Sequence, residues 1–171
     1  MSGGVGCESI KPLIKKFRKY GIPEDRFYCI LAGNNAKLKE TIAKSCSSDK
    51  VQAVGFTDKV HLYLKAADVV ISKSGGLSST EVAVANVPVV HFQPIPGCET
   101  CNARFYEAKG MSKLAKNSKE ALKIAEALLE NEAERQSMVE AQRREINAYS
   151  ADDVVKRVVE VVEARNATEK E

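Results

Sequence analysis

The sequence contains no apolar run that approaches the roughly 18 residues needed to cross a bilayer. Residues 1–6 lack a basic segment followed by an apolar core, so we expect no secretory signal. Neither sign of charge is in large excess, because the net charge is only +3 over 171 residues. This excess is too small to predict nucleic-acid binding. Hydrophobic residues make up 44% and charged residues 29%, which is typical of one globular domain. We therefore expect a cytoplasmic protein with no nucleic-acid partner.

Cysteines are few and odd in number: the sequence has five, Cys7, Cys29, Cys46, Cys98 and Cys101. An odd count, with one cysteine inside an apolar strand-like run, favours a reduced, cytosolic setting over a disulfide framework. The Cys98-x-x-Cys101 pair could be half of a zinc site or a redox pair. A structural zinc site usually needs four ligands, and the sequence has no second C-x-x-C and no paired histidines. A metal or redox role is therefore the disfavoured alternative, and we expect neither a metal nor a cofactor.

Short apolar runs alternate with helical patterns along the chain, and five of these runs predict strands at 27–31, 51–54, 68–72, 88–92 and 111–115. Because the runs are apolar on both faces, they predict a doubly wound, Rossmann-like α/β domain with helices on both faces of a parallel sheet. We expect about six strands, the first truncated, since the chain opens on a glycine loop that normally follows a strand. The domain should span residues 1–165, and residues 166–171 should form a disordered polar tail.

Ligands of open α/β sheets bind beyond the carboxyl ends of the strands, and three loops at that edge are informative. The first, residues 3–6, can bring backbone amides to a phosphate, although a flexible chain end explains its glycines equally well. The second, residues 72–81, joins a strand to a helix expected at 78–85 and offers amides, hydroxyls and a helix dipole to a pyrophosphate. The third, residues 93–102, is made rigid by two prolines and a glycine.

Two acidic residues in these loops have structural as well as functional interpretations. Ser78-x-x-Glu81 fits a capping box, in which Glu81 would bond to the Ser78 backbone, and the local sequence favours this cap. In the third loop, Gln93, Glu99 and Asn102 could form hydrogen bonds with sugar hydroxyls. Glu99 could equally occupy the first helical turn, where a negative charge is favourable in any case.

The remaining polar groups indicate no catalytic centre. His61 is expected on a helix surface, and His91 is expected to be a packed strand histidine rather than a catalytic one. The sequence holds no nucleophile elbow and no Ser/His/Asp arrangement. Five basic residues cluster early in the chain. These residues are Lys11, Lys15, Lys16, Arg18 and Lys19. Such a cluster most often forms a solvated helix face, and a peripheral membrane contact is the minority alternative.

The order and spacing of four segments resemble the C-terminal domain of GT-B glycosyltransferases. They are 54–60 (VGFTDKV), 66–81 (AADVVISKSGGLSSTE), 87–90 (VPVV) and 94–105 (PIPGCETCNARF). The resemblance is strongest to the diacylglycerol glycosyltransferases and galactolipid synthases. The lipid II N-acetylglucosaminyltransferase is similar at a greater distance. The resemblance extends from the opening glycine loop to about Ala127.

The resemblance implies a UDP-sugar donor and gives a role to each matching position. It implies contacts to uracil (Phe56, Thr57), to the diphosphate (Gly4, Gly6, Ser74, Gly75, Gly76, Leu77), to the ribose (Glu81) and to the donor sugar (Gly97, Cys98, Glu99, Asn102). For Glu81 the resemblance thus favours ribose binding over the helix cap. Cys98 stands where the lipid glycosyltransferases have Gln, and Thr100 where many have Glu, which leaves the identity of the donor sugar open.

Members of the resembled family are hexosyltransferases that invert the anomeric centre. An acceptor hydroxyl attacks while UDP leaves, and the general base and the acceptor site lie in an N-terminal domain. We assign no catalytic residue to this chain and expect it to be inactive alone, meeting a lipid acceptor such as diacylglycerol through that domain. Three alternatives remain: a stand-alone donor subunit of a two-component transferase, a non-catalytic UDP-sugar-binding module and, more weakly, a UDP-sugar epimerase.

Overall fold

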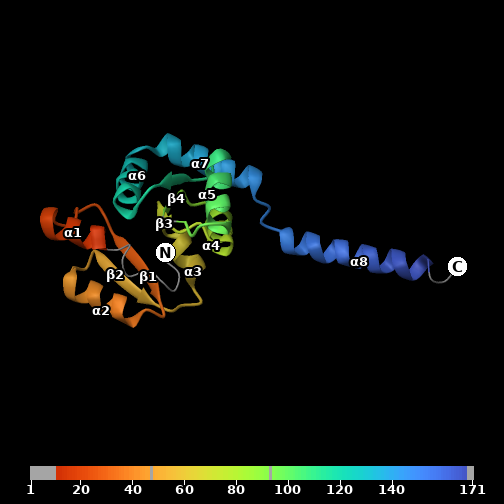
Figure 1. The fold of residues 1–171 in the computed structure, drawn as a ribbon, viewed down its shortest axis with the longest axis horizontal. Helices are drawn as coiled ribbons and strands as arrows, with labels where there is room; N and C mark the ends of the chain where they lie inside the picture. The colour runs from red at the N-terminus through yellow and green to blue at the C-terminus, as the bar shows by residue number, and fades with distance from the viewer. Residues whose placement is uncertain (1–10, 47, 93, 169–171) are drawn as a thin grey trace.

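Strands and helices alternate through the computed structural model, which describes residues 11–46, 48–92 and 94–168 (Figure 1). One sheet pairs β1 (Tyr28–Gly33) with β2 (Val51–Gly55). A second sheet has the order β3 (Val70–Ser72), β4 (Val89–Phe92), β5 (Lys113–Ala115). All paired strands are parallel, which confirms the predicted α/β class. The described residues thus hold five strands in two sheets, close to the expected six in one.

Helices α1 (Lys11–Tyr20) and α2 (Ala36–Ser45) cover the first sheet. The inward side chains of α1 include Phe17, whose ring meets the ring of Tyr28 edge-on at 4.7 Å between centroids. Helix α2 begins after Asn35, whose side-chain oxygen accepts the backbone N–H of Leu38 at 2.9 Å and so satisfies one free helical donor. An ion pair from α1 then joins this layer to the second sheet's helices.

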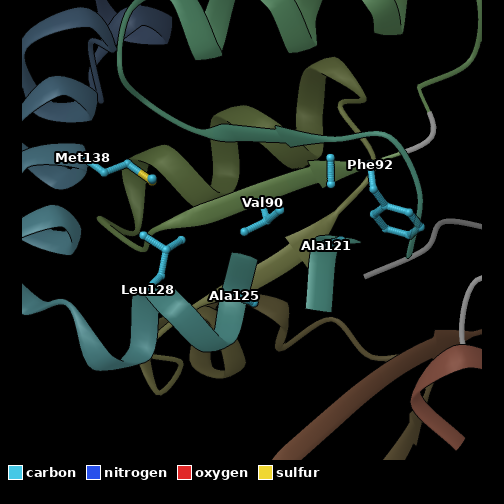
Figure 2. Packing of buried hydrophobic residues seen from close by; sticks show 7 residues of the cluster. Val90, Phe92, Ala121, Ala125, Leu128 and Met138 are labelled. Atoms are coloured by element: carbon cyan, nitrogen blue, oxygen red, sulfur yellow. The ribbon is translucent and has the colours of Figure 1, made fainter. Parts of the chain in front are cut away.

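The centre of the second sheet is β4, whose four residues are all buried. Side chains alternate along a strand, so Val90 and Phe92 face α6 (Ser118–Glu130), whose inward alanines allow close approach (Figure 2). Val89 faces the other way, toward α3 (Val60–Lys65) and α4 (Gly76–Val84). Burying each of these aliphatic side chains contributes about 1.5–3 kcal/mol. Helices therefore cover both faces of this sheet, as predicted.

Two further helices complete the domain, and both contact the loops that connect the strands. Helix α5 (Cys98–Ala108) follows β4, and α7 (Glu132–Glu145) packs across α4 and α6. The buried Gln142 of α7 donates both amide hydrogens, to the carbonyls of Val87 at 2.9 Å and Met111 at 3.1 Å. These bonds satisfy carbonyls that precede β4 and β5, and so position both strands.

Helix α8 (Ser150–Thr168) extends away from the rest of the chain (Figure 1). All its residues from 150 to 166 are exposed, including Val154, Val158, Val161 and Val162, whose i, i+4, i+7, i+8 spacing puts them on one face. The helix includes residues 166–168, where a disordered tail was expected, while residues 169–171 lie outside the described chain. None of the described helices is long and apolar enough to cross a membrane.

Candidate donor-binding site

The helix after β3 begins earlier than the sequence predicted. Helix α4 starts at Gly76, with Gly75 as an extended N-cap residue that makes no side-chain capping bond. Ser78 therefore lies inside the helix, so the capping box between Ser78 and Glu81 is wrong. The first N–H groups of a helix have no intrahelical partner, and here no side chain caps them. This helix start is open to an acceptor such as a phosphate oxygen.

Glu81 is exposed on α4, one turn after the helix start. In the described part of the chain, its side chain takes part in no hydrogen bond and no ion pair. With the cap excluded, its carboxylate is available to a ligand. Leu77, also at the start of α4, is 84% exposed, so its side chain contributes nothing to the core.

The turn after β3 is joined to the start of α5 by two hydrogen bonds. Ser74, which is fully buried, donates its hydroxyl to the carbonyl oxygen of Glu99 at 2.7 Å. Asn102 donates its amide to the carbonyl oxygen of Ser74 at 3.0 Å. We call this arrangement, with Gly75 and Gly76, the Ser74 junction. It brings together residues for which the sequence implied separate contacts to the diphosphate and to the donor sugar.

The glycines of the Ser74 junction lie against the polar side chains of α5. A Cβ atom placed on Gly75 would be 3.8 Å from Glu99 Oε1, and one on Gly76 would be 3.9 Å from Asn102 Nδ2. Both distances are ordinary van der Waals contacts, so the ligand-free fold does not itself require glycine at either position. The glycines leave the backbone accessible on the ligand side, which is what close approach of a phosphate needs.

Glu99 occupies the first turn of α5, as the structural interpretation of this residue predicted. Its Oε2 atom accepts the backbone N–H of Ile95 at 2.7 Å, and Thr100 donates to the Ile95 carbonyl at 3.3 Å. One carboxylate oxygen of Glu99 therefore holds its own loop, while Oε1 faces Gly75. Gly97 precedes the helix with φ 99°, a conformation that side chains rarely adopt.

Cys98 is the first residue of α5, and its side chain is exposed. Its sulfur lies 3.9 Å from the amide nitrogen of Asn102, the same group that bonds to Ser74. Cys98, at the position where the sequence resemblance implies a glutamine, thus contacts the Ser74 junction directly. The thiol accepts only a weak hydrogen bond, so it anchors the Asn102 side chain less firmly than an amide oxygen would.

The turn after β2 contains Phe56 and Thr57, the residues implied for uracil. Phe56 is 76% exposed, and the Thr57 hydroxyl accepts the backbone N–H of Lys59 at 3.1 Å. We call these two residues the base turn. Among the described residues, no hydrogen bond or ion pair joins the base turn to the Ser74 junction. Gly4, Gly6 and Gln93, also predicted as ligand residues, lie outside the described residues, and their roles stay predictions.

A buried polar layer under α4 was not anticipated. His91 is fully buried, as predicted for a packed strand histidine, and its Nε2 lies 3.1 Å from the Ser79 hydroxyl. Its ring also meets the Tyr106 ring edge-on at 5.5 Å. Burial lowers the pKa of His91 to about 4, so the ring is neutral at pH 7.

This layer corrects one expectation from the sequence. Ser79 was grouped with the hydroxyls offered to a pyrophosphate, but it is fully buried and bonds to His91 instead. The available signal was its position three residues after Gly76, one turn into the helix and next to the inward Val82 and Ala83 face. The polar layer supports the helix whose first turn forms part of the site.

A hollow of the described surface lies away from this site. A cavity of about 420 Å³ is lined by Asp68, Asn86 and Pro88, before β3 and β4, and by Arg135 and Arg143 of α7. These positions are at the amino ends of the strands, and none of its lining residues belongs to the Ser74 junction or the base turn. Ligands of α/β proteins bind at the carboxyl edge, so this hollow is not the candidate site.

Comparison with known proteins identifies the family. The model of the glycosyl transferases group 1 family matches residues 8–145. The chain belongs to the group 1 glycosyl transferases. The match includes β1 to β5, the base turn and the Ser74 junction, so the candidate site lies within the matched part of this glycosyltransferase domain.

A curated relative has the function that the sequence resemblance suggested. A processive diacylglycerol beta-glucosyltransferase from Bacillus thuringiensis (strain Al Hakam) is 27% identical over 154 residues, which is 89% of this chain. That alignment takes up 39% of the relative, so the glycosyltransferase domain spans well under half of its length. The match confirms the predicted resemblance to the diacylglycerol glycosyltransferases.

Solved structures show the same fold. The MnaA protein of S. aureus, solved with UDP, superimposes with a TM-score of 0.71 at 18% identity, over 94% of this chain and 43% of that chain. MurG from Acinetobacter baumannii gives 0.68 at 22% identity, over 94% of this chain and 48% of that chain. These matches confirm the predicted GT-B type of α/β fold.

Proposed function

We propose that this chain is the donor-binding domain of an inverting hexosyltransferase that uses a UDP-sugar and glycosylates a lipid such as diacylglycerol. The family match supports glycosyl transfer, and the curated relative supports a lipid acceptor. The neighbour solved with UDP supports a uridine nucleotide at the carboxyl edge of the sheet. The fold alone does not separate a transferase from a UDP-sugar epimerase, so the family match is the reason to favour transfer.

The observation that carries the proposal is the uncapped start of α4 within the Ser74 junction. Gly75 is the N-cap residue and Gly76 the first helical residue, and a Cβ atom at either would meet Glu99 or Asn102 at an ordinary van der Waals distance. Backbone N–H groups and the helix dipole favour a negatively charged group at this point. In a glycosyl transfer, negative charge builds up on the departing diphosphate, so a fixed set of donors here would stabilise the transition state.

The other residues would then divide the rest of the donor between them. Phe56 and Thr57 would hold the uracil, and Glu81 the ribose hydroxyls. Cys98, Glu99 and Asn102, with Gly97, would contact the sugar. An acceptor hydroxyl would attack the anomeric carbon while UDP leaves, assisted by a general base. We place that base and the lipid site in a partner domain, and the proposal needs no metal and no cofactor.

Cys98 supports one alternative, a module that binds a UDP-sugar without transferring it. A thiol in place of an amide removes one strong hydrogen-bond donor to a sugar hydroxyl. A donor-binding subunit that joins a separate acceptor-binding subunit is the other alternative. Transfer restored by adding an acceptor-binding domain would support either form of the transferase, and binding that never leads to transfer would support the module.

The test is calorimetric titration of the 171-residue chain with UDP, UDP-glucose and UDP-galactose. We expect weak binding of UDP, weakened further in Glu81→Ala by about tenfold or more, because a hydrogen bond to a charged group contributes about 1.5–3 kcal/mol. Glu163→Ala, on the exposed face of α8, is the matched control and should bind like the wild type.

Three results would count against the proposal or a part of it. The absence of any heat of binding at millimolar UDP would contradict every hypothesis in which the chain binds this donor. Sugar transfer to diacylglycerol by the purified chain alone would contradict the view that it holds only the donor half of the reaction. Glu81→Ala with unchanged affinity would contradict the role given to that residue.

A further inference from the structure

The first turn of α5 carries two thiols that the proposed function does not use as a pair. Cys98 is the first residue of the helix and Cys101 lies three residues later, and both are exposed. Residues three apart on a helix are neighbours, with roughly 5–6 Å between their Cβ atoms. A C-x-x-C pair in a βαβ setting is typical of dithiol redox chemistry. Cys46, by contrast, is buried, and burial raises the pKa of its thiol.

Zinc does not explain the pair. A structural zinc site usually takes four ligands, and the described residues contain no group of three or more His, Cys, Asp or Glu side chains that could hold a metal. Oxidation to a disulfide needs only the two thiols. The missing second pair, which disfavours a metal on sequence grounds, is therefore no argument against a disulfide.

The residues next to the two thiols in the sequence belong to the Ser74 junction. Between them lies Glu99, whose carbonyl accepts the Ser74 hydroxyl at 2.7 Å. One residue after them lies Asn102, which contacts Cys98 Sγ at 3.9 Å and donates to the Ser74 carbonyl at 3.0 Å. A change in the first turn of α5 therefore acts directly on the groups that hold the turn after β3.

We propose that Cys98 and Cys101 form a reversible disulfide that loosens the Ser74 junction and weakens donor binding. The inference rests on the proposed function for its effect on UDP. The oxidant is a small-molecule disulfide such as oxidised glutathione. One cysteine thiolate attacks it and releases one thiol, and the second cysteine then attacks the mixed disulfide and releases another. Two electrons and two protons pass from the cysteines to the oxidant, which leaves as two thiols.

The geometry gives the direction of the effect. A disulfide holds its Cβ atoms roughly 3.5–4.5 Å apart, whereas helical neighbours three residues apart are at roughly 5–6 Å. Closing the bridge must tighten the first turn of α5 by about 1–2 Å, the difference between these two separations. That movement displaces Glu99 and removes the contact between Cys98 and Asn102. The hydrogen bonds to Ser74, which depend on both residues, are weakened as a result.

The experiment compares the full chain in reduced and in oxidised glutathione buffers. Alkylation followed by peptide mapping identifies the bridge, and UDP calorimetry measures its effect. Amide hydrogen exchange at residues 74–76 and 98–102 reports on the Ser74 junction without any ligand. Cys101→Ser is the matched variant, since Cys101 has no assigned contact to the donor. It should bind UDP like the reduced wild type and should form no bridge in the oxidising buffer. Peptide mapping identifies any mixed disulfide left on Cys98 of this variant, and the dithiol reductant removes it.

We expect a Cys98–Cys101 bridge, UDP binding at least about fivefold weaker in the oxidised chain, and full recovery with a dithiol reductant. The proposal is overturned if both thiols remain alkylatable in the oxidising buffer, or if the bridge forms with unchanged affinity. If the reduced chain binds no UDP, the proposed function fails instead. The disulfide is then judged by exchange alone: faster exchange of the junction amides in the oxidised chain supports it, and unchanged exchange overturns it.

Discussion

The base turn follows β2 of the first sheet and the Ser74 junction follows β3 of the second sheet, and the two are built differently. The junction is fixed by hydrogen bonds that join residues 25 and 28 positions apart, and it rests on the buried layer of Ser79 and His91. The base turn has one local hydrogen bond, from Lys59 to Thr57, and a Phe56 ring that is 76% exposed.

The difference indicates which part of the donor the protein is prepared for. Donors that are fixed before binding cost little to reorganise when charge develops on a diphosphate. An exposed aromatic ring, in contrast, gains its contacts only when a base covers it. We infer that the diphosphate meets a preformed surface and that the uracil completes its own binding surface. Variants and pH changes that act on only one of the two turns test this contrast.

The largest effect should come from acidifying the layer beneath the junction. Burial lowers the pKa of His91 to about 4, so between pH 6.5 and 4 the unfolded state binds the proton more readily. The stabilising contribution is therefore complete above pH 6.5 and is lost as the pH falls toward 4, at a cost of about 3 kcal/mol. Tyr106 is the titratable side chain in ring contact with His91.

Urea unfolding at pH 7 and pH 4.5 measures this loss in the wild type and in His91→Gln. The variant keeps a polar group near Ser79 but cannot be protonated in this range, so the part of the loss due to His91 should disappear. Carboxylates contribute equally to both proteins. The relevant quantity is therefore the difference between the two proteins in how much their free energy of unfolding falls from pH 7 to pH 4.5. An equal loss of unfolding free energy in both proteins would show that His91 does not take up a proton on unfolding in this range.

The next largest effect should come from Asn102→Ala. The substitution removes the hydrogen bond to the Ser74 carbonyl, which is worth about 1–1.5 kcal/mol and fixes the Ser74 junction before binding. UDP must then order the junction itself, so its binding should weaken by up to about tenfold. Binding of inorganic pyrophosphate should weaken by a similar factor, because the Ser74 junction is proposed to bind the diphosphate. Calorimetry with both ligands is the measurement, and Asn166→Ala on exposed α8 is the control. Unchanged pyrophosphate binding would place Asn102 outside the diphosphate surface.

Phe56→Ala should have a smaller effect that is confined to the base. Stacking of a base on an aromatic ring is worth about 1–3 kcal/mol, and an exposed ring should give the low end, about fivefold for UDP. Pyrophosphate affinity should not change, and the melting temperature should stay close to that of the wild type, because the side chain buries little. A variant that loses pyrophosphate binding as well would remove the contrast between the two turns.

Gly76→Ala should separate the fold from the ligand with the smallest change. The added Cβ meets Asn102 Nδ2 at 3.9 Å, so the chain should fold normally, with about 0.4–1 kcal/mol of added stability from a less flexible unfolded state. UDP should nevertheless bind more weakly if the diphosphate approaches the backbone here. Gly97→Ala is the contrasting variant, since its φ of 99° should make any side chain destabilising. Thermal melts and calorimetry on both variants provide the measurement.

The sequence was informative wherever local pattern decides the structure. The apolar runs predicted all five described strands to within a few residues, and the alternation predicted their parallel pairing. The motif order predicted that the turns after β2, β3 and β4 would bear the candidate residues. Ser74, Glu99 and Asn102 were each predicted separately, Ser74 from the family resemblance and Glu99 and Asn102 as polar residues of the loop after β4.

The sequence could not show what depends on contacts between distant residues. Nothing local indicates that Ser74 bonds to Glu99, or that Ser79 turns inward to His91. The start of α4 was placed two residues late, because glycines usually mark a turn, whereas Gly75 and Gly76 here serve as N-cap and first helical residue. The heptad-like valines of α8 predict an apolar face but not where the helix points.

That valine face has a practical consequence for work with the chain in solution. Six valines of α8 are each between 49% and 63% exposed, which is a large apolar surface for one helix. Apolar surface of this kind associates more strongly as protein concentration rises and in the presence of sulfate or phosphate salts. Affinities measured for the Ser74 junction and the base turn should therefore be collected as a dilution series in low-salt buffer. Only then does a change in binding report on the site instead of on the state of aggregation.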